Sequence, residues 1–93
     1  MKTIHGYKTV PVGIVAVMLP VGAVVRAVTY KDDTGEVVLW AEGDDSHMLE
    51  QRLFEVFTPN KAMHEDMGVT RVFIGSFMVR PEAEWPLFIY ERV

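Results

Sequence analysis

The stretch of residues 9–25 constrains the fold more than any other part of the sequence. It carries no formal charge and is strongly apolar, so its length comes close to the minimum for a membrane-spanning helix. Pro11, Gly13, Pro20 and Gly22 interrupt it, however, and valine predominates. Prolines remove hydrogen bonds from a helix, whereas strands separated by turns lose none. The stretch therefore predicts β-strands joined by turns, and no transmembrane segment.

Further runs with strand character follow, with turn residues between them. The strand-like runs cover residues 2–10, 13–19, 23–30, 37–41, 69–78 and 86–90. The unbroken apolar run 13–19 is typical of a strand covered on both faces. The Lys-Asp-Asp-Thr-Gly-Glu segment after Tyr30 predicts a hairpin with a late glycine. We expect one mainly β domain over residues 1–93, an antiparallel β-sandwich or partly open barrel of six or seven strands.

Residues 46–58 can be read in two ways. Helical spacing fits Met48, Leu49, Arg52, Leu53 and Val56. Strand alternation fits the second half equally well, because it places Arg52, Phe54 and Val56 on one face and the residues between them on the other. Taken alone, the pattern favours a helix, and the strand stays open as the alternative. A short helix is a further expectation for residues 60–68.

Composition limits the partners and the chemistry of the chain. It has 93 residues, nine basic against thirteen acidic, and a net charge of −4 without any basic cluster, so binding to duplex nucleic acid is not expected. There is no cysteine, which excludes disulfides and thiolate zinc sites. A 49% apolar content is high for so small a domain. Some apolar surface should therefore meet a partner or a second copy, which predicts a homo-oligomer as one outcome.

No constellation typical of an enzyme is visible, and we expect neither catalysis nor a cofactor. His5, His47 and His64 are far apart, which is unlike the paired spacing of a zinc site, so no metal is expected. Ser46 and His47 are neighbours, but the strand-turn-helix motif of serine hydrolases is missing. Phosphate-binding glycine loops are also missing.

The candidates for binding are three apolar side chains and a set of cations. Met63 and Met67 would share one face of the short helix, and methionine suits adaptable contact surfaces. Trp85 stands at the edge of a turn, where it either closes the core or anchors a partner. Trp40 lies within an apolar run and is expected in the core. The cations that could gather around a nucleotide at a subunit boundary are Arg26, Arg52, Arg71 and Arg80.

An ordered set of short fragments resembles a family of uncharacterised proteins encoded by bacteriophages and prophages. The fragments are Met-Lys-Thr-Ile at residue 1, Leu-Pro-Val-Gly-Ala at 19, Leu-Trp-Ala at 39, residues 52–57 and Phe-Ile-Gly-Ser-Phe at 73. The resemblance implies a phage origin and an all-β domain, and it carries no established activity. It also favours a strand at residues 52–57. The chain departs from the family in a longer loop at residues 59–68.

These expectations combine into one functional hypothesis with two alternatives. The first is a small, phage-encoded, non-catalytic protein that engages a host protein in the host cytoplasm, since no signal-peptide pattern opens the chain. The second is sequestration of a small signalling nucleotide between subunits. The third is a minor structural or assembly role in the virion.

Overall fold

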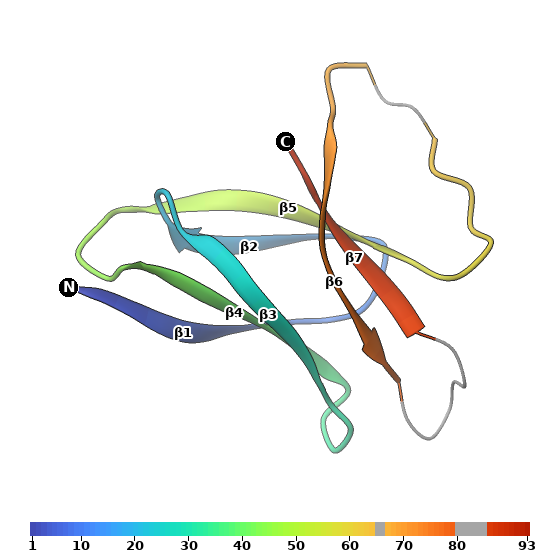
Figure 1. Cartoon of the computed structure of the whole chain (residues 1–93), viewed down its shortest axis with the longest axis horizontal. Helices are drawn as coiled ribbons and strands as arrows, with labels where there is room; N and C mark the ends of the chain where they lie inside the picture. Colours follow the sequence, from blue (N-terminus) through green and yellow to red (C-terminus); the bar gives the residue numbers. More distant parts are fainter. Residues whose placement is uncertain (65–66, 80–85) are drawn as a thin grey trace.

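The described residues form seven β-strands arranged in two antiparallel sheets (Figure 1). The computed structural model describes residues 1–64, 67–79 and 86–93. The strands are β1 (Lys2–Thr9), β2 (Ile14–Pro20), β3 (Val24–Lys31), β4 (Glu36–Asp44), β5 (Leu49–Phe57), β6 (Arg71–Met78) and β7 (Pro86–Arg92). The described residues contain no helix, and the expectation of a small antiparallel β-sandwich or partly open barrel with six or seven strands is confirmed in its sandwich form.

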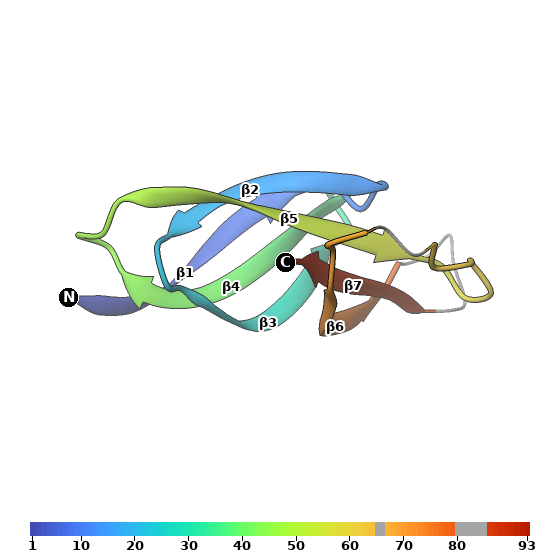
Figure 2. The ribbon, with the colours of Figure 1, turned by 90° about the horizontal axis from the view of Figure 1, so that it is seen from above.

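The two sheets form the layers of a flat molecule. One sheet has the order β1-β4-β3 and the other has the order β2-β5-β7-β6. Figure 2 shows β2 and β5 running above β4 and β3, with β2 along one rim. The Cα atoms extend over 39 × 37 × 16 Å, so the molecule is one sandwich thick. Each sheet therefore has an inner face in the core and an outer face toward solvent.

Two glycine turns lie where the sequence predicts them, one leading from β2 to β3 in the other sheet and one joining the paired strands β3 and β4. The Ala23 amide donates to the Pro20 carbonyl at 3.0 Å, and Gly22 between them has a φ of 81°. A positive φ at the third position of such a turn is strained for residues with a side chain, so glycine fits there. Between β3 and β4, the Gly35 amide donates to the Lys31 carbonyl at 2.8 Å. The predicted hairpin is therefore confirmed.

The core lies between the inner faces of the two sheets. Its fully covered side chains come from the central strands β4, β5 and β7 and from the end of β2: Leu19, Val37, Leu39, Phe54 and Ile89. The sheets also meet at β3 and β6, where Tyr30 stacks on Phe77 with ring centroids 6.1 Å apart. Gly75 of β6 makes room there for Val28, because a Cβ on Gly75 would lie 3.3 Å from a Val28 methyl carbon.

The segment that sequence left open is a strand. β5 spans Leu49–Phe57, so the helix favoured by the pattern alone is wrong and the strand favoured by the family resemblance is right. Phe54 and Val56 point to the core, as the alternation predicts. The helix expected at residues 60–68 is absent from its described part, since residues 61–64 have no regular structure and Met67 and Gly68 form a turn.

Two burial expectations are also wrong. Trp40 lies on the outer face of the β1-β4-β3 sheet and is 39% exposed, because Leu39 and Ala41 take the inner positions of β4. The apolar strand β2 is covered on one face only, because the other sheet packs against its inner face and no described layer packs against its outer face. Apolar content here does not mean burial on both faces.

Candidate functional site

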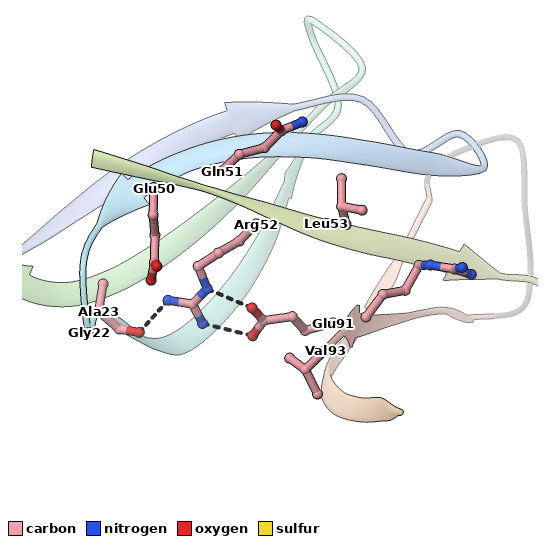
Figure 3. A pocket seen from close by; sticks show the side chains of 9 residues that line it. Gly22, Ala23, Glu50, Gln51, Arg52, Leu53, Glu91 and Val93 are labelled. Atoms are coloured by element: carbon pink, nitrogen blue, oxygen red, sulfur yellow. Dashed lines mark hydrogen bonds and ion pairs between the residues drawn. The ribbon is translucent and has the colours of Figure 1, made fainter. Parts of the chain in front are cut away.

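The molecule has a shallow pocket of about 520 Å³ at the end of the sandwich where the last strand finishes. It is lined by the start of β3, by β5 and by the end of β7, including Ala23, Glu50, Arg52, Glu91 and Val93. Figure 3 shows the alternation of β5 at this point: Glu50 and Arg52 point toward the pocket, while Gln51 and Leu53 point to the opposite side of the strand. The pocket therefore presents charged side chains, and the outer face presents Gln51 and Leu53.

A two-pronged ion pair fills the centre of the pocket (Figure 3). Arg52 Nε donates to one Glu91 carboxylate oxygen at 2.6 Å and Nη2 donates to the other at 2.7 Å. Nη1 donates to the Ala23 carbonyl. The hydrogen bond to Glu91 raises the pKa of Arg52, although partial burial opposes the shift. All three donor nitrogens are engaged within the chain, so Arg52 ties the two sheets together and is not presented to an incoming anion.

The four-stranded sheet exposes apolar side chains on its outer face. Antiparallel pairing places Ala16 opposite Leu53, Met18 opposite Gln51 and Pro20 opposite Leu49, which puts these side chains on one face. We name the β2–β5 patch for its five members: Ile14, Ala16, Met18, Leu49 and Leu53. The four larger side chains are between 37% and 55% exposed, and Ala16 is also exposed. Apolar side chains that cluster on one exposed face mark candidate interaction surfaces.

The same face carries a charged cluster beside the patch. Arg71 Nε and Arg92 Nη1 each donate to Oε1 of Glu55 at 2.9 Å. Glu55 is buried, with 9% of the residue exposed. Burial alone would raise the pKa of Glu55, but the hydrogen bonds and charges of the two guanidinium groups outweigh it and lower the pKa. The cluster is therefore a charged, hydrogen-bonded border to the apolar patch.

Aromatic rings continue the outer face beyond the charged cluster. Tyr90 meets Phe57 edge-on at 5.6 Å and Phe73 at 5.3 Å between ring centroids. Phe57 is buried, and the Lys61 ammonium and the Arg71 guanidinium lie 5.1 and 5.6 Å from its ring centroid. Phe73, by contrast, is 56% exposed. The face thus ends in a second exposed apolar position.

The residues singled out from sequence do not gather in this patch. Met63 is 46% exposed and Met67 is fully exposed, both outside any strand and outside the β2–β5 patch. Trp85 and Arg80 lie outside the described residues. Of the other expected cations, Arg26 pairs with Glu42, Arg52 with Glu91 and Arg71 with Glu55. These pairs lie on different faces, so one chain does not bring the arginines together.

Residues typical of metal or catalytic sites are also dispersed in the described part of the chain. No group of three or more His, Asp or Glu side chains there could hold a metal ion. His47 places Nδ1 3.2 Å from the Val21 carbonyl. Ser46 donates its hydroxyl to Asp44 at 2.6 Å and so closes the turn after β4. The hydrogen bonds from Ser46 lower the pKa of Asp44. No described helix is long and apolar enough to cross a membrane.

Sequence reasoning missed the β2–β5 patch because it assigned β2 to the interior. The available signal was the absence of any charge from Ile14 to Pro20, which is unusual for an edge strand. Nothing in the sequence indicates which strand of a sheet lies at its edge, so the signal could not be interpreted without the topology.

The fold and these surfaces define a small two-sheet β protein that leaves one apolar sheet face uncovered. The family model described as Domain of unknown function (DUF7352) matches residues 1–93, and the chain belongs to this family. No curated protein and no solved structure matches the chain.

Proposed function

We propose that the protein is a small, non-catalytic binding protein that engages a partner protein through the β2–β5 patch. The observation that carries this proposal is the exposure of Ile14, Met18, Leu49 and Leu53 on one sheet face, between 37% and 55% each. Their side chains contain no acid, base or nucleophile, so they offer shape and apolar area. Exposed apolar side chains that cluster on one face and are bordered by charged groups are typical of protein interaction sites.

The resemblance of its sequence fragments to a family of bacteriophage and prophage proteins favours a host protein as the partner, in the host cytoplasm. The protein would meet such a host partner in the infected cell, where it is synthesised. The patch suits an apolar surface on the partner, because its five members are all apolar.

The proposal is tested by affinity capture from host lysate with matched variants. Leu49→Lys and Leu53→Gln, singly and together, make the β5 side of the patch polar. Val24→Lys is the control, because Val24 is 47% exposed on the outer face of the other sheet and lies opposite Glu42. Circular dichroism and thermal unfolding establish that each variant is folded.

The expected result is one host protein recovered by the wild type and by Val24→Lys, and reduced at least tenfold by the double variant. The recovered protein is then purified, and calorimetry measures its affinity for each variant. Recovery of no protein above background, or equal recovery by the double variant, would contradict the proposal. Loss with Val24→Lys alone would place the contact on the other sheet and equally contradict it.

A further inference from the structure

The free edge of β2 has backbone groups that no other strand in the described part of the chain uses. The Val56 amide donates to the Gly13 carbonyl at 2.9 Å, and the Val21 amide donates to the Met48 carbonyl at 2.8 Å. In an antiparallel pair, bonded residues alternate with residues whose N–H and C=O point away. The odd-numbered positions of β2 therefore face β5. Ile14, Ala16 and Met18 direct their amides and carbonyls outward, and all three residues are exposed.

The other sheet edges carry the features that prevent strand addition. β1 has Lys2 and Lys8, and β3 has a bulge between Val25 and Ala27, with the charged Arg26 inside it. β6 begins at a charged arginine and has its own bulge between Phe73 and Gly75. Charges and bulges at edges hinder pairing with another chain. β2 has no charge and no bulge along its pairing with β5, so its edge lacks the features that hinder pairing with another strand.

The sequence of this edge is suited to pairing with itself. An antiparallel pair centred on Ala16 places Ala16 opposite Ala16 of the second copy, and Ile14 opposite Met18 of the second copy. Every outward amide and carbonyl of these three residues then has a partner across the two-fold axis. The small alanine stands at the axis, and the flanking cross-strand pairs are apolar on both sides.

The ends of β2 fix this register and stop the ladder. Pro20 has no amide hydrogen, so the pairing cannot continue past Met18 at that end. Gly13 has a φ of 48°, which takes the backbone out of the strand conformation at the other end. We propose that a second copy of the chain pairs with β2 about a two-fold axis at Ala16, so that the two four-stranded sheets become one continuous sheet.

Pairing of this kind also joins the two β2–β5 patches into one surface. Each copy contributes Ile14 and Met18 to the junction and keeps Leu49 and Leu53 beside it. Because the junction buries no charge, assembly needs no charged group to be removed from water. In a two-fold pair the β2 edges of both chains are occupied by each other, so no further chain can add and the assembly is a dimer.

The first test is the solution mass of wild type and edge variants by analytical ultracentrifugation over a wide concentration range. The wild type is expected at twice the chain mass of 10.6 kDa. Ala16→Pro removes an outward amide and leaves the ladder to β5 intact, and Met18→Lys adds a charge to the edge. Each variant should raise the dimer dissociation constant at least tenfold, while Val24→Lys should not change it.

A second readout locates the contact. Hydrogen exchange at the Ala16 and Met18 amides should slow as protein concentration rises, whereas stacking of two sheet faces would leave these amides unprotected. A wild type that stays monomeric, variants that dimerise like the wild type, or exchange at these amides that is independent of concentration would overturn the proposal. If Ala16→Pro does not fold, Met18→Lys and hydrogen exchange still decide. Leu49→Lys with Leu53→Gln should retain the dimer, so failure of the proposed function is distinguishable from failure of this inference.

Discussion

At the scale of single residues, one glycine explains how a tryptophan is held on a sheet surface. A Cβ on Gly6 would lie 2.9 Å from a Val38 methyl carbon and 3.1 Å from the Trp40 ring. Glycine therefore leaves the space that the indole occupies across β1. The indole N–H donates to Thr29 Oγ1 at 2.9 Å, which fixes the ring from the β3 side. The indole thus connects all three strands of its sheet, which is its structural role outside the core.

The close contacts at Gly6 define the first prediction. Alanine usually stabilises a strand relative to glycine, but here its methyl group would displace the indole or Val38. We expect Gly6→Ala to lower the free energy of unfolding by about 1–2 kcal/mol. Urea denaturation followed by tryptophan fluorescence measures it. In a Trp40→Ala background the same substitution should be less harmful, and an equal loss in both backgrounds would contradict this explanation.

The buried carboxylate Glu55 defines a prediction about pH. Its pKa is lowered from 4.5, so the ionised form stabilises the fold above the unfolded pKa and this contribution is lost as the pH falls through the folded pKa. We expect the wild type to lose stability progressively as the pH falls below the ordinary pKa of a glutamate, about 4.5. Urea denaturation at a series of pH values measures this dependence.

Glu55→Gln serves as the matched variant for that pH series. It removes the carboxylate from two guanidinium groups, so it should be less stable at pH 7 by about 3 kcal/mol. Its stability should also depend less on pH in the acid range, although Asp44, whose pKa is lowered too, keeps some dependence. A variant with the full pH dependence of the wild type would show that Glu55 is not the titrating group.

At the scale of elements, the Arg52–Glu91 pair joins β5, β7 and the start of β3. The two side chains are 16% and 10% exposed, so a charge left without its partner would be largely buried. We expect Arg52→Met to lower the free energy of unfolding by about 3 kcal/mol, and the double change Arg52→Met with Glu91→Leu to recover most of that loss. A double-mutant cycle by chemical denaturation measures the coupling.

The exposed pair of Arg26 and Glu42 is the control for that cycle. Arg26 is 57% exposed at its side chain, so water screens the pair. We expect Arg26→Met to change stability by less than about 1 kcal/mol. Coupling of equal size in the two pairs would contradict the role assigned to burial.

The strand elements were predictable to the extent that local chemistry defines them. The turn at Gly22 and the hairpin at Gly35 follow from residue types alone, and the strands around them are in place. β5 was ambiguous because Arg52 and Glu55 are charged residues at largely buried positions of the strand. Their ionic partners come from strands distant in the sequence, namely Glu91, Arg71 and Arg92. The patch was hidden for a related reason: being at the edge of a sheet is a property of topology, and local sequence does not encode it.

At the scale of the whole molecule, the two sheets depend on the contact between β3 and β6. Phe77 is 6% exposed and stacks on Tyr30 with an interplanar angle of 12°. We expect Phe77→Ala to destabilise the protein by about 4 kcal/mol, measured by thermal or chemical unfolding. The control Phe73→Ala removes a ring that is 56% exposed and should be much less harmful. An equal loss of stability in the two variants would show that the contact between β3 and β6 has no special part in stability.

The order β2-β5-β7-β6 places a late strand in the middle of its sheet. In the described part of the chain, β6 pairs through its backbone with β7 and not with β5, so β6 has no strand partner in its sheet until residues 86–92 have been synthesised. A growing chain on the ribosome can form the hairpin of β3 and β4, but not the four-stranded layer. The four-stranded sheet is completed only after the late residues have been released from the ribosome. Until then, the uncharged β2 segment is open to unwanted association. Rapid synthesis of the last third of the chain therefore favours the yield of native protein.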